Sequence, residues 1–359
     1  MDGRAPDRSG ARGRGALSSP ASRYAAQRSE PFDDGWQQDP LPPLQTTVTP
    51  DASRTVIARN ESPDIPFDRS INPYRGCEHG CVYCYARPGH AWLGLSPGLD
   101  FETRLTAKLD AATLLRRELS ARGYRCAPIA LGSVTDAYQP VERAHRVTRS
   151  ILEVLREARH PVTLVTKAAL VERDIDLLAD LAADALVQVR VSVTTLRPEL
   201  ARRLEPRAAS PARRLEAIAR LREAGVPVGV MVAPLIPVLT DAELEAVLAA
   251  ARDAGAIEAG YVLLRLPLEV AGLFRDWLAE HAPLQAERVM ARVRDTRGGL
   301  DNDPRFGHRM AGEGVFADLV AQRFRLACGR LGFGELPPLR TDLFRAPAAP
   351  GHDGQLALF

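Results

Sequence analysis

The stretch that decides the fold is NPYRGCEHGCVYCYARP, residues 72–88, which carries three of the five cysteines of this 359-residue chain. Cys77, Cys81 and Cys84 are separated by three and two residues, and glycines beside them let the backbone curl. Three soft thiolates in one short loop can each bind one iron of a cubane cluster, whose usual complement is four cysteines. The spacing therefore predicts a 4Fe-4S cluster with one iron that lacks a protein ligand.

A structural zinc site is the alternative for this loop, with His79 or His90 completing a Cys3His set. Zinc sites of this kind usually take their ligands from two separated pairs, and no second pair follows at a suitable distance. A disulfide framework would spread paired cysteines along the chain, which these cysteines do not do. Cys126 and Cys328 stand alone, and we expect them to be small core residues.

Downstream of the loop, short β-rich apolar runs alternate with segments of helical periodicity, which is typical of βα units and a parallel sheet. Such a chain forms an α/β fold, here a partial (β/α)6 barrel, with its chemistry at the C-terminal ends of the strands. Ser210 before Pro211 indicates the start of one helix, and Thr240 with Glu243 predicts a capping box for the next. The predicted strands begin near Ile71 and lie at 127–132, 162–166, 186–193, 228–232 and 261–265.

The composition supports a globular protein, because 45% of the residues are hydrophobic and 47 basic residues nearly balance 45 acidic ones. The net charge does not itself indicate a nucleic-acid or membrane partner. The sequence shows no apolar stretch long enough to span a membrane and no secretory signal, so we expect a cytoplasmic location. We predict a disordered tail over 1–45, a barrel domain with a C-terminal helical extension over 55–345, and a flexible tail over 346–359.

The cysteine spacing, with Tyr83 directly before the last cysteine, resembles the radical S-adenosylmethionine (SAM) superfamily. Together with LGSVTDAYQP at 131–140 and VTK at 165–167, the loop resembles the spore photoproduct lyase related branch, often labelled DNA repair photolyase-like. The resemblance implies that the open iron binds S-adenosylmethionine and cleaves it to a 5′-deoxyadenosyl radical. It further implies a lyase-like enzyme that repairs damaged DNA and receives electrons from a flavodoxin or ferredoxin.

The resemblance also assigns roles to strand-end residues. Asp136 and Tyr138 are the predicted catalytic residues, which orient the substrate or relay hydrogen, although Asp136 equally suits a helix cap. Arg265 suits a phosphate or carboxylate ligand, or a salt bridge at the rim. Strand-forming preference and a solvated rim charge are the plainer explanations for Ser192 and Lys167. The residues expected to bind the cofactor are Tyr83, Ser133, Thr135, Lys167, Ser192 and Ala233.

The sequence departs from the branch at one important point. Spore photoproduct lyases place a hydrogen-donating cysteine at the end of the second strand, and residues 131–136 contain none. The thymine-dimer reaction is therefore in doubt, and two alternatives stay open. One is radical modification of RNA or protein, and the other is a DNA-associated iron–sulfur sensing module without radical catalysis.

The last five residues, QLALF, resemble the short peptide by which bacterial replication and repair proteins bind the sliding clamp. In that interpretation Leu356, Leu358 and Phe359 are apolar anchors or flank them, and Gln355 makes polar contacts at the edge of the pocket. An apolar terminus that folds back onto the barrel is the alternative.

Overall fold

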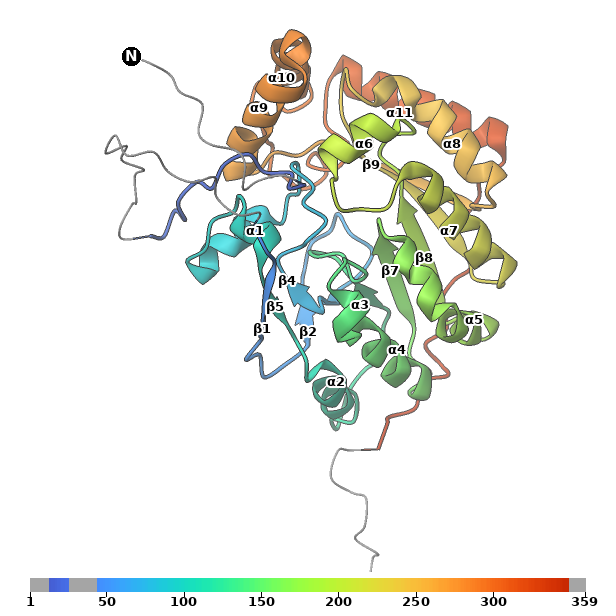
Figure 1. The fold of residues 1–359 in the computed structure, drawn as a ribbon. Coiled ribbons are helices and arrows are strands. Elements are labelled where there is room, and N and C mark those ends of the chain that lie inside the picture. The colour runs from blue at the N-terminus through green and yellow to red at the C-terminus, as the bar shows by residue number, and fades with distance from the viewer. Residues whose placement is uncertain (1–12, 26–43, 349–359) are drawn as a thin grey trace, which may run out of the picture.

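The computed structural model describes residues 13–25 and 44–348 (Figure 1). The predicted clamp-binding residues 355–359 lie outside the described residues, as do 1–12 and 26–43 of the predicted tail. No helix of the described part is long and apolar enough to cross a membrane.

A seven-stranded sheet forms the centre of the molecule, in the order β10-β9-β8-β7-β6-β3-β2. Each predicted strand is present, and each pairs in parallel with its neighbour in the sheet. The open, chain-ordered sheet confirms the predicted α/β fold, and β2 (Ile57–Arg59) adds an antiparallel edge strand that the sequence did not predict. The parallel strands are β3 (Arg69–Ile71), β6 (Ile129–Leu131), β7 (Val162–Thr166), β8 (Val187–Ser192), β9 (Val228–Leu235) and β10 (Glu258–Leu263).

Helices cover the outer face of the sheet and alternate with its strands (Figure 1). The core between the two layers consists of buried branched side chains, as expected for parallel strands that are covered on both faces. The covering helices are α2 (Ala111–Leu119), α4 (Val147–Glu157), α5 (Ile175–Ala183), α7 (Pro211–Glu223) and α8 (Leu244–Asp253). Two short helices, α3 (Glu142–His145) and α6 (Pro198–Leu204), follow β6 and β8. The C-terminal extension adds α9 (Glu269–His281), α10 (Ala286–Asp295) and α11 (Val315–Leu331).

The two predicted helix starts have different outcomes. Ser210 caps α7 by accepting a hydrogen bond from the Arg213 backbone N–H at 3.4 Å, as predicted. The capping box of Thr240 and Glu243 is wrong, because the Thr240 hydroxyl instead accepts from the backbone N–H of Ile236 at 2.8 Å. Glu243 reaches across to the 195–197 loop instead, where better donors are available.

A second, smaller sheet lies beside the barrel in the order β1-β5-β4, formed by β1 (Thr47–Pro50), β5 (Arg104–Ala107) and β4 (Tyr74–Arg75). Strand β4 leads directly into the cysteine loop, and α1 (Asp100–Thr103) leads into β5. The small sheet therefore fixes the loop's entrance against residues about 30 positions further along the chain.

Residues 13–25 differ from the predicted disordered tail. Arg14, Gly15 and Ala16 are buried, and their polar groups bond to the segment around Glu102. Composition alone did not indicate this, because the contact uses backbone N–H groups and glycines rather than a periodic apolar face. This part of the segment packs on the body of the protein.

Candidate active site

The three cysteines of the predicted cluster lie in a closed loop between β4 and the 3-10 helix η2 (Arg87–Leu93). Cys77 and Cys81 are buried and Cys84 is partly buried. Backbone turns fold the loop back on itself, with N–H to carbonyl distances of 3.3 Å from Gly80 to Cys77 and 3.2 Å from Cys84 to Cys81. The loop thus gathers the three thiols in one buried region.

Burial raises the pKa of all three thiols, because a thiolate in this environment loses its hydration. Without a metal the thiols are therefore protonated at neutral pH. Metal binding replaces these protons and supplies the positive charge that buried thiolates need. The donor set fits a soft iron centre.

The spacing of the sulfurs distinguishes a cluster from a single ion. Within the described residues, Asp303, His308 and Glu313 form the only group of three such ligands whose atoms all lie within 4.8 Å of one another. At least one pair of the three cysteine sulfurs therefore lies more than 4.8 Å apart. Two sulfurs on one zinc lie at most about 4.6 Å apart, which is twice the Zn–S bond length. The arrangement fits a multi-iron cluster better than zinc.

Both histidines proposed as a fourth zinc ligand already have protein partners. His90 Nε2 lies 3.0 Å from the Arg104 carbonyl oxygen. His79 Nδ1 lies 3.4 Å from an Asp136 carboxylate oxygen, and both side chains are nearly inaccessible to solvent. A histidine bound to zinc commonly uses its second ring nitrogen in the same way, so these contacts do not decide between zinc and a cluster.

The loop is held by one side chain that the sequence analysis missed. Gln139 is fully buried, and its Oε1 accepts from the Glu78 backbone N–H at 2.7 Å while its Nε2 donates to the Gly76 carbonyl at 3.2 Å. These two peptide groups flank Cys77. Gln139 belongs to the 131–140 segment, so this contact joins that segment to the cysteine loop.

Arg87 holds the other end of the loop. Its guanidinium donates to the Cys81 carbonyl at 2.9 Å and to the Gly80 carbonyl at 3.2 Å. The same group forms an ion pair of 2.5 Å with Glu102, and neither side chain is exposed to solvent. Arg87 and Glu102 were also missed, since nothing in their spacing indicates that they meet.

Tyr83 and Lys167, two predicted cofactor-binding residues, meet at Glu205. The Tyr83 hydroxyl donates to the Glu205 carboxylate, and Lys167 Nζ lies 3.6 Å from it. Burial alone would raise the pKa of Glu205, but Arg214 and Lys167 outweigh burial and bring it to about 2. Lys167 also donates to the Ala233 carbonyl at 2.7 Å, which joins the ends of β7 and β9.

Other predicted cofactor contacts lie at the same strand ends. Ser133 accepts a hydrogen bond from the Asn72 amide at 3.2 Å, and the Thr135 hydroxyl donates to the Tyr74 carbonyl at 3.1 Å. Ser192 is buried at the end of β8. The structure therefore brings the predicted set to the C-terminal edge of the sheet, although the Thr135 hydroxyl is already used within the protein.

Asp136 and Tyr138, the predicted catalytic pair, lie deeper than the sequence suggested. Asp136 accepts from the Thr166 hydroxyl and the Lys167 backbone N–H, both at 2.7 Å. Burial alone would raise the pKa of Asp136, but His79 and these hydrogen bonds bring it to about 2. Tyr138 is 1% exposed and lies in the hydrophobic core. These positions favour a structural role for both side chains, and their catalytic role stays a prediction.

The mouth of the barrel carries two arginine–aromatic pairs. The Arg265 guanidinium carbon lies 5.2 Å from the centre of the Tyr85 ring, and that of Arg309 lies 4.8 Å from the centre of the Phe306 ring. Both rings are exposed, and Tyr85 directly follows Cys84. Arg309 is paired with Asp64. Arg265 makes no ion pair with a described carboxylate, and its Nε is buried without a hydrogen-bond acceptor in that part of the chain.

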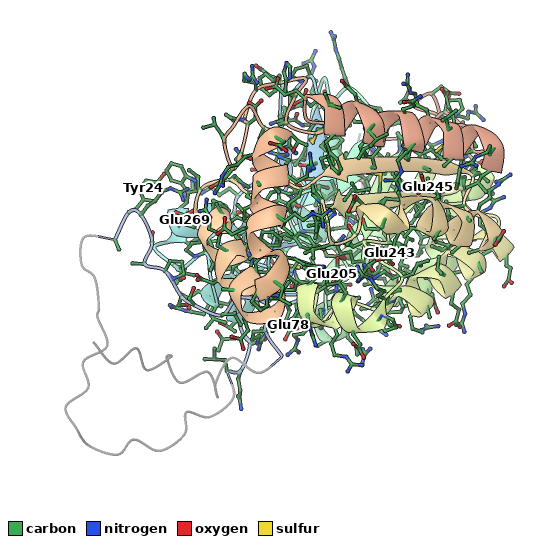
Figure 2. The ribbon with its side chains drawn as sticks, turned by 90° about the horizontal axis from the view of Figure 1, so that it is seen from above. Tyr24, Glu78, Glu205, Glu243, Glu245 and Glu269 are labelled. Carbon is green, nitrogen blue, oxygen red and sulfur yellow. The ribbon has the colours of Figure 1, made fainter. Side chains whose placement is uncertain are left out.

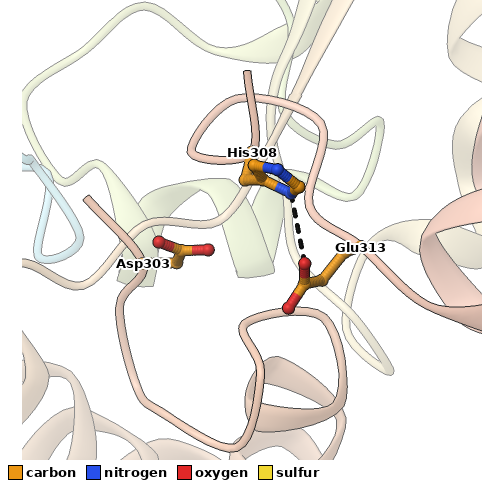
Figure 3. A group of neighbouring side chains, drawn as sticks. All are labelled: Asp303, His308 and Glu313. Carbon is orange, nitrogen blue, oxygen red and sulfur yellow. Dashed lines mark ion pairs between the residues drawn. The ribbon is translucent and has the colours of Figure 1, made fainter. Parts of the chain in front are cut away.

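A second set of potential metal ligands, Asp303, His308 and Glu313, lies in the loop before α11 (Figure 3). Arg305 already donates to Asp303 at 2.7 Å and to Glu313 at 3.1 Å, and His308 forms an ion pair of 3.1 Å with Glu313. A guanidinium between the carboxylates satisfies the charge that a metal ion would neutralise. We interpret this group as a loop-stabilising ion-pair network.

Comparison with known proteins agrees with the fold and the loop. The family model of the radical SAM superfamily matches residues 71–251, about half of the chain, and spans the cysteine loop and the strand ends described above. The chain belongs to the radical SAM superfamily. Members of this superfamily use a 4Fe-4S cluster and S-adenosylmethionine.

Similar sequences include an uncharacterized protein of Mycobacterium tuberculosis, 38% identical over 221 residues, which cover 61% of this chain and 65% of the relative. An uncharacterized protein of Methanocaldococcus jannaschii is 30% identical over 174 residues, 48% of this chain and 62% of the relative. The chain thus matches less than two thirds of these relatives' length.

Among solved structures, spore photoproduct lyase complexed with dinucleoside spore photoproduct has a TM-score of 0.54 at 16% identity, covering 80% of each chain. A variant of that lyase with bound S-adenosylmethionine and the same dinucleoside gives the same TM-score at 15% identity and covers 80% of each chain. At this identity the likeness establishes the fold.

Proposed function

We propose that Cys77, Cys81 and Cys84 hold three irons of a 4Fe-4S cluster and leave the fourth iron for S-adenosylmethionine. The observation that carries this proposal is the convergence of three cysteines, two buried and one partly buried, in a loop fixed by Gln139 and Arg87. When bound and reduced, such a cluster supplies the electron that cleaves S-adenosylmethionine to a 5′-deoxyadenosyl radical. The remaining roles belong to the protein's own side chains.

The strand-end residues are suited to bind S-adenosylmethionine. Lys167 Nζ is a fixed cation beside the loop and suits the cofactor's carboxylate. The Ser133 and Ser192 side chains add short hydroxyls at the ends of β6 and β8, on either side of β7, which suit polar atoms of the cofactor. The Ala233 carbonyl orients the Lys167 ammonium rather than leaving it to solvent. Tyr83, fixed by Glu205, lies next to the third cysteine and suits the adenine edge.

We propose further that the substrate is a nucleic acid, with damaged DNA as the leading candidate. Arg265 is a half-buried cation without a carboxylate partner in the described chain, and it lies over an exposed tyrosine beside the loop. Arg309 also lies over an exposed ring, that of Phe306, although its charge is paired with Asp64. Cations that bind phosphates, alternating with aromatic rings that stack on bases, are typical of single-strand recognition. The fold shared with a lyase solved with a dinucleoside lesion supports the same substrate class.

Residues 131–136 contain no cysteine at the end of the second strand, so this segment offers no thiol to return a hydrogen atom. The proposal is therefore radical chemistry on nucleic acid and does not include the thymine-dimer reaction itself. Radical modification of RNA or protein is the second candidate, and the lack of a hydrogen-donating cysteine in residues 131–136 supports it. A flavodoxin or ferredoxin is the proposed source of electrons, since superfamily members need a reductant.

The test is anaerobic reconstitution with iron and sulfide, dithionite reduction, and chromatographic measurement of 5′-deoxyadenosine formed from S-adenosylmethionine. We expect product formation that increases with ultraviolet-irradiated DNA over unirradiated DNA. Stimulation by RNA alone would shift the assignment to the second candidate. Four irons without any cleavage, and no effect of S-adenosylmethionine on the electron paramagnetic resonance spectrum, would favour a sensing module.

The ligand assignment has its own variant and control. Cys81→Ala removes one of the three ligands and should abolish both iron retention and cleavage. Cys126→Ala makes the same chemical change at a partly buried cysteine outside the loop and should retain both. Full iron content in Cys81→Ala would contradict the assignment.

A further inference from the structure

Residues 13–25, called the strap from here on, bind a carboxylate close to the cysteine loop. The backbone N–H groups of Gly15 and Ala16 donate to the two carboxylate oxygens of Glu102 at 2.9 and 2.8 Å. The Arg14 guanidinium donates to the Glu102 carbonyl at 3.1 Å. Strap and carboxylate are more than 80 residues apart in sequence, so this contact is a tertiary one.

Glu102 connects the strap to the cluster loop through Arg87. Its carboxylate also pairs with Arg87, whose guanidinium donates to the carbonyls of Gly80 and Cys81. Arg87 and Glu102 are fully buried, and Arg14 is 8% exposed. A buried ion pair is stable only when its remaining lone pairs are satisfied, and the strap satisfies those of Glu102.

A second connection runs from the strap to the first cysteine. Arg14 donates to the Thr46 hydroxyl at 3.0 Å, and that hydroxyl donates to the Glu78 carboxylate at 2.5 Å. Glu78 directly follows Cys77 and also forms an ion pair of 2.8 Å with Arg207. The strap is therefore connected to the loop at two places, next to Cys81 through Glu102 and next to Cys77 through Thr46.

Two glycines allow the strap to approach so closely. A Cβ atom at Gly15 would lie 1.7 Å from the Gly80 carbonyl oxygen, and one at Gly98 would lie 2.2 Å from the Ser18 carbonyl oxygen. The first glycine belongs to the strap and the second to the body. Any side chain at either position requires the strap to move.

The rest of the strap is attached to η2 and α9. The Ser22 hydroxyl donates to the Ala91 carbonyl at 3.0 Å, and the Ser96 hydroxyl donates to the Pro20 carbonyl at 2.7 Å. Arg23 pairs with Glu269 of α9 at 2.5 Å, beside Tyr24 (Figure 2). These contacts position the strap along the loop on the side that leads to α9.

We propose that the strap is a clamp on the cluster loop, which fixes the peptide groups around Cys81 and thereby slows the loss of iron. This inference rests on the proposed function, because it takes Cys77, Cys81 and Cys84 as the ligands. Arg14 and Glu102 act as positioning residues, since they reach the loop only through other groups, whereas Gly15 packs directly against the Gly80 carbonyl.

The test compares Gly15→Ala and Gly98→Ala with the wild-type protein after reconstitution. The rate of iron loss to an excess of a ferrous chelator, measured anaerobically, should rise roughly tenfold in both variants, because at least one buried hydrogen bond to Glu102 is lost. Trypsin should cleave after Arg14 and Arg23 faster in both variants. Gly89→Ala is the matched control, because a Cβ there meets nothing within 4 Å, and it should match the wild type in both assays.

The outcomes separate the two proposals. A wild-type protein that takes up no iron contradicts the ligand assignment itself. A wild type that holds its cluster, with faster trypsin cleavage but unchanged iron loss in both variants, overturns the clamp alone. Unchanged cleavage in both variants overturns it too, because the strap would then not depend on these close contacts. Thermal unfolding of each apoprotein verifies that the barrel stays folded.

Discussion

The two sides of the cysteine loop differ in how their charges are paired. On the strap side, Arg87 and Glu102 form a fully buried pair, and Glu78 pairs with Arg207. At the barrel mouth, Arg265 is half-buried and forms no ion pair with a carboxylate in the described chain. The sequence allows a salt bridge at the rim for Arg265, but the described residues contain no such ion pair. A half-buried cation without a counter-ion is unfavourable. We propose that the paired side maintains the loop and that Arg265 at the mouth binds an anion.

The largest effect is expected for Glu102→Gln, which leaves the Arg87 cation buried without its counter-ion. Removing one partner of a buried pair costs about 3–5 kcal/mol. We expect the free energy of unfolding of the apoprotein to fall by about this amount, measured by urea denaturation. Because the apoprotein contains no cluster, the result tests the ion pair itself.

Its matched control is Glu157→Gln, which breaks the Arg116–Glu157 ion pair of 2.5 Å between side chains that are 32% and 44% exposed. Exposed pairs of this kind contribute less than about 1 kcal/mol. A loss at Glu102 no larger than the loss at Glu157 would remove the distinction between the two sides of the loop.

The contrast also shows what the sequence could and could not predict. The parallel strands and the strand-end position of Lys167 follow from periodicity and spacing, which are local properties. The partners Arg87, Glu102 and Gln139 have no local pattern, because each acts on peptide groups that folding brings close. The motif predicts a catalytic role for Tyr138 but does not predict its burial in the core, since spacing does not fix the direction of a side chain after a strand.

A smaller effect is expected from Gln139→Ala, which leaves the Glu78 N–H and the Gly76 carbonyl without their partner. Buried groups that lose a hydrogen bond cost about 1–3 kcal/mol. We expect that loss in apoprotein stability, together with reduced iron retention after reconstitution. Gln188→Ala is the control, since its Nε2 donates to the Pro337 carbonyl near the surface, and we expect little change there. Equal effects of the two variants would show that Gln139 does not support the loop specifically.

The unpaired side is tested by Arg265→Gln, which should weaken binding of single-stranded DNA roughly tenfold and reduce the salt dependence of binding by about one phosphate contact. The apoprotein should unfold at an unchanged or slightly higher temperature, because the substitution removes a half-buried cation. Arg330→Gln makes the same charge change in the last turn of α11 and controls for net charge. Equal affinity of Arg265→Gln and the control would contradict an anion-binding mouth.

The smallest effect on stability is expected at Glu313, whose side chain is ion-paired but not buried. Glu313 pairs with Arg305 and His308 as fully as Glu102 pairs with its neighbours, but the Glu313 side chain is 34% exposed (Figure 3). Solvent screens these charges, so Glu313→Gln should change the free energy of unfolding by less than about 1 kcal/mol. If urea denaturation instead shows a loss comparable to that of Glu102→Gln, the number of partners rather than their burial determines how strongly an ion pair supports this fold.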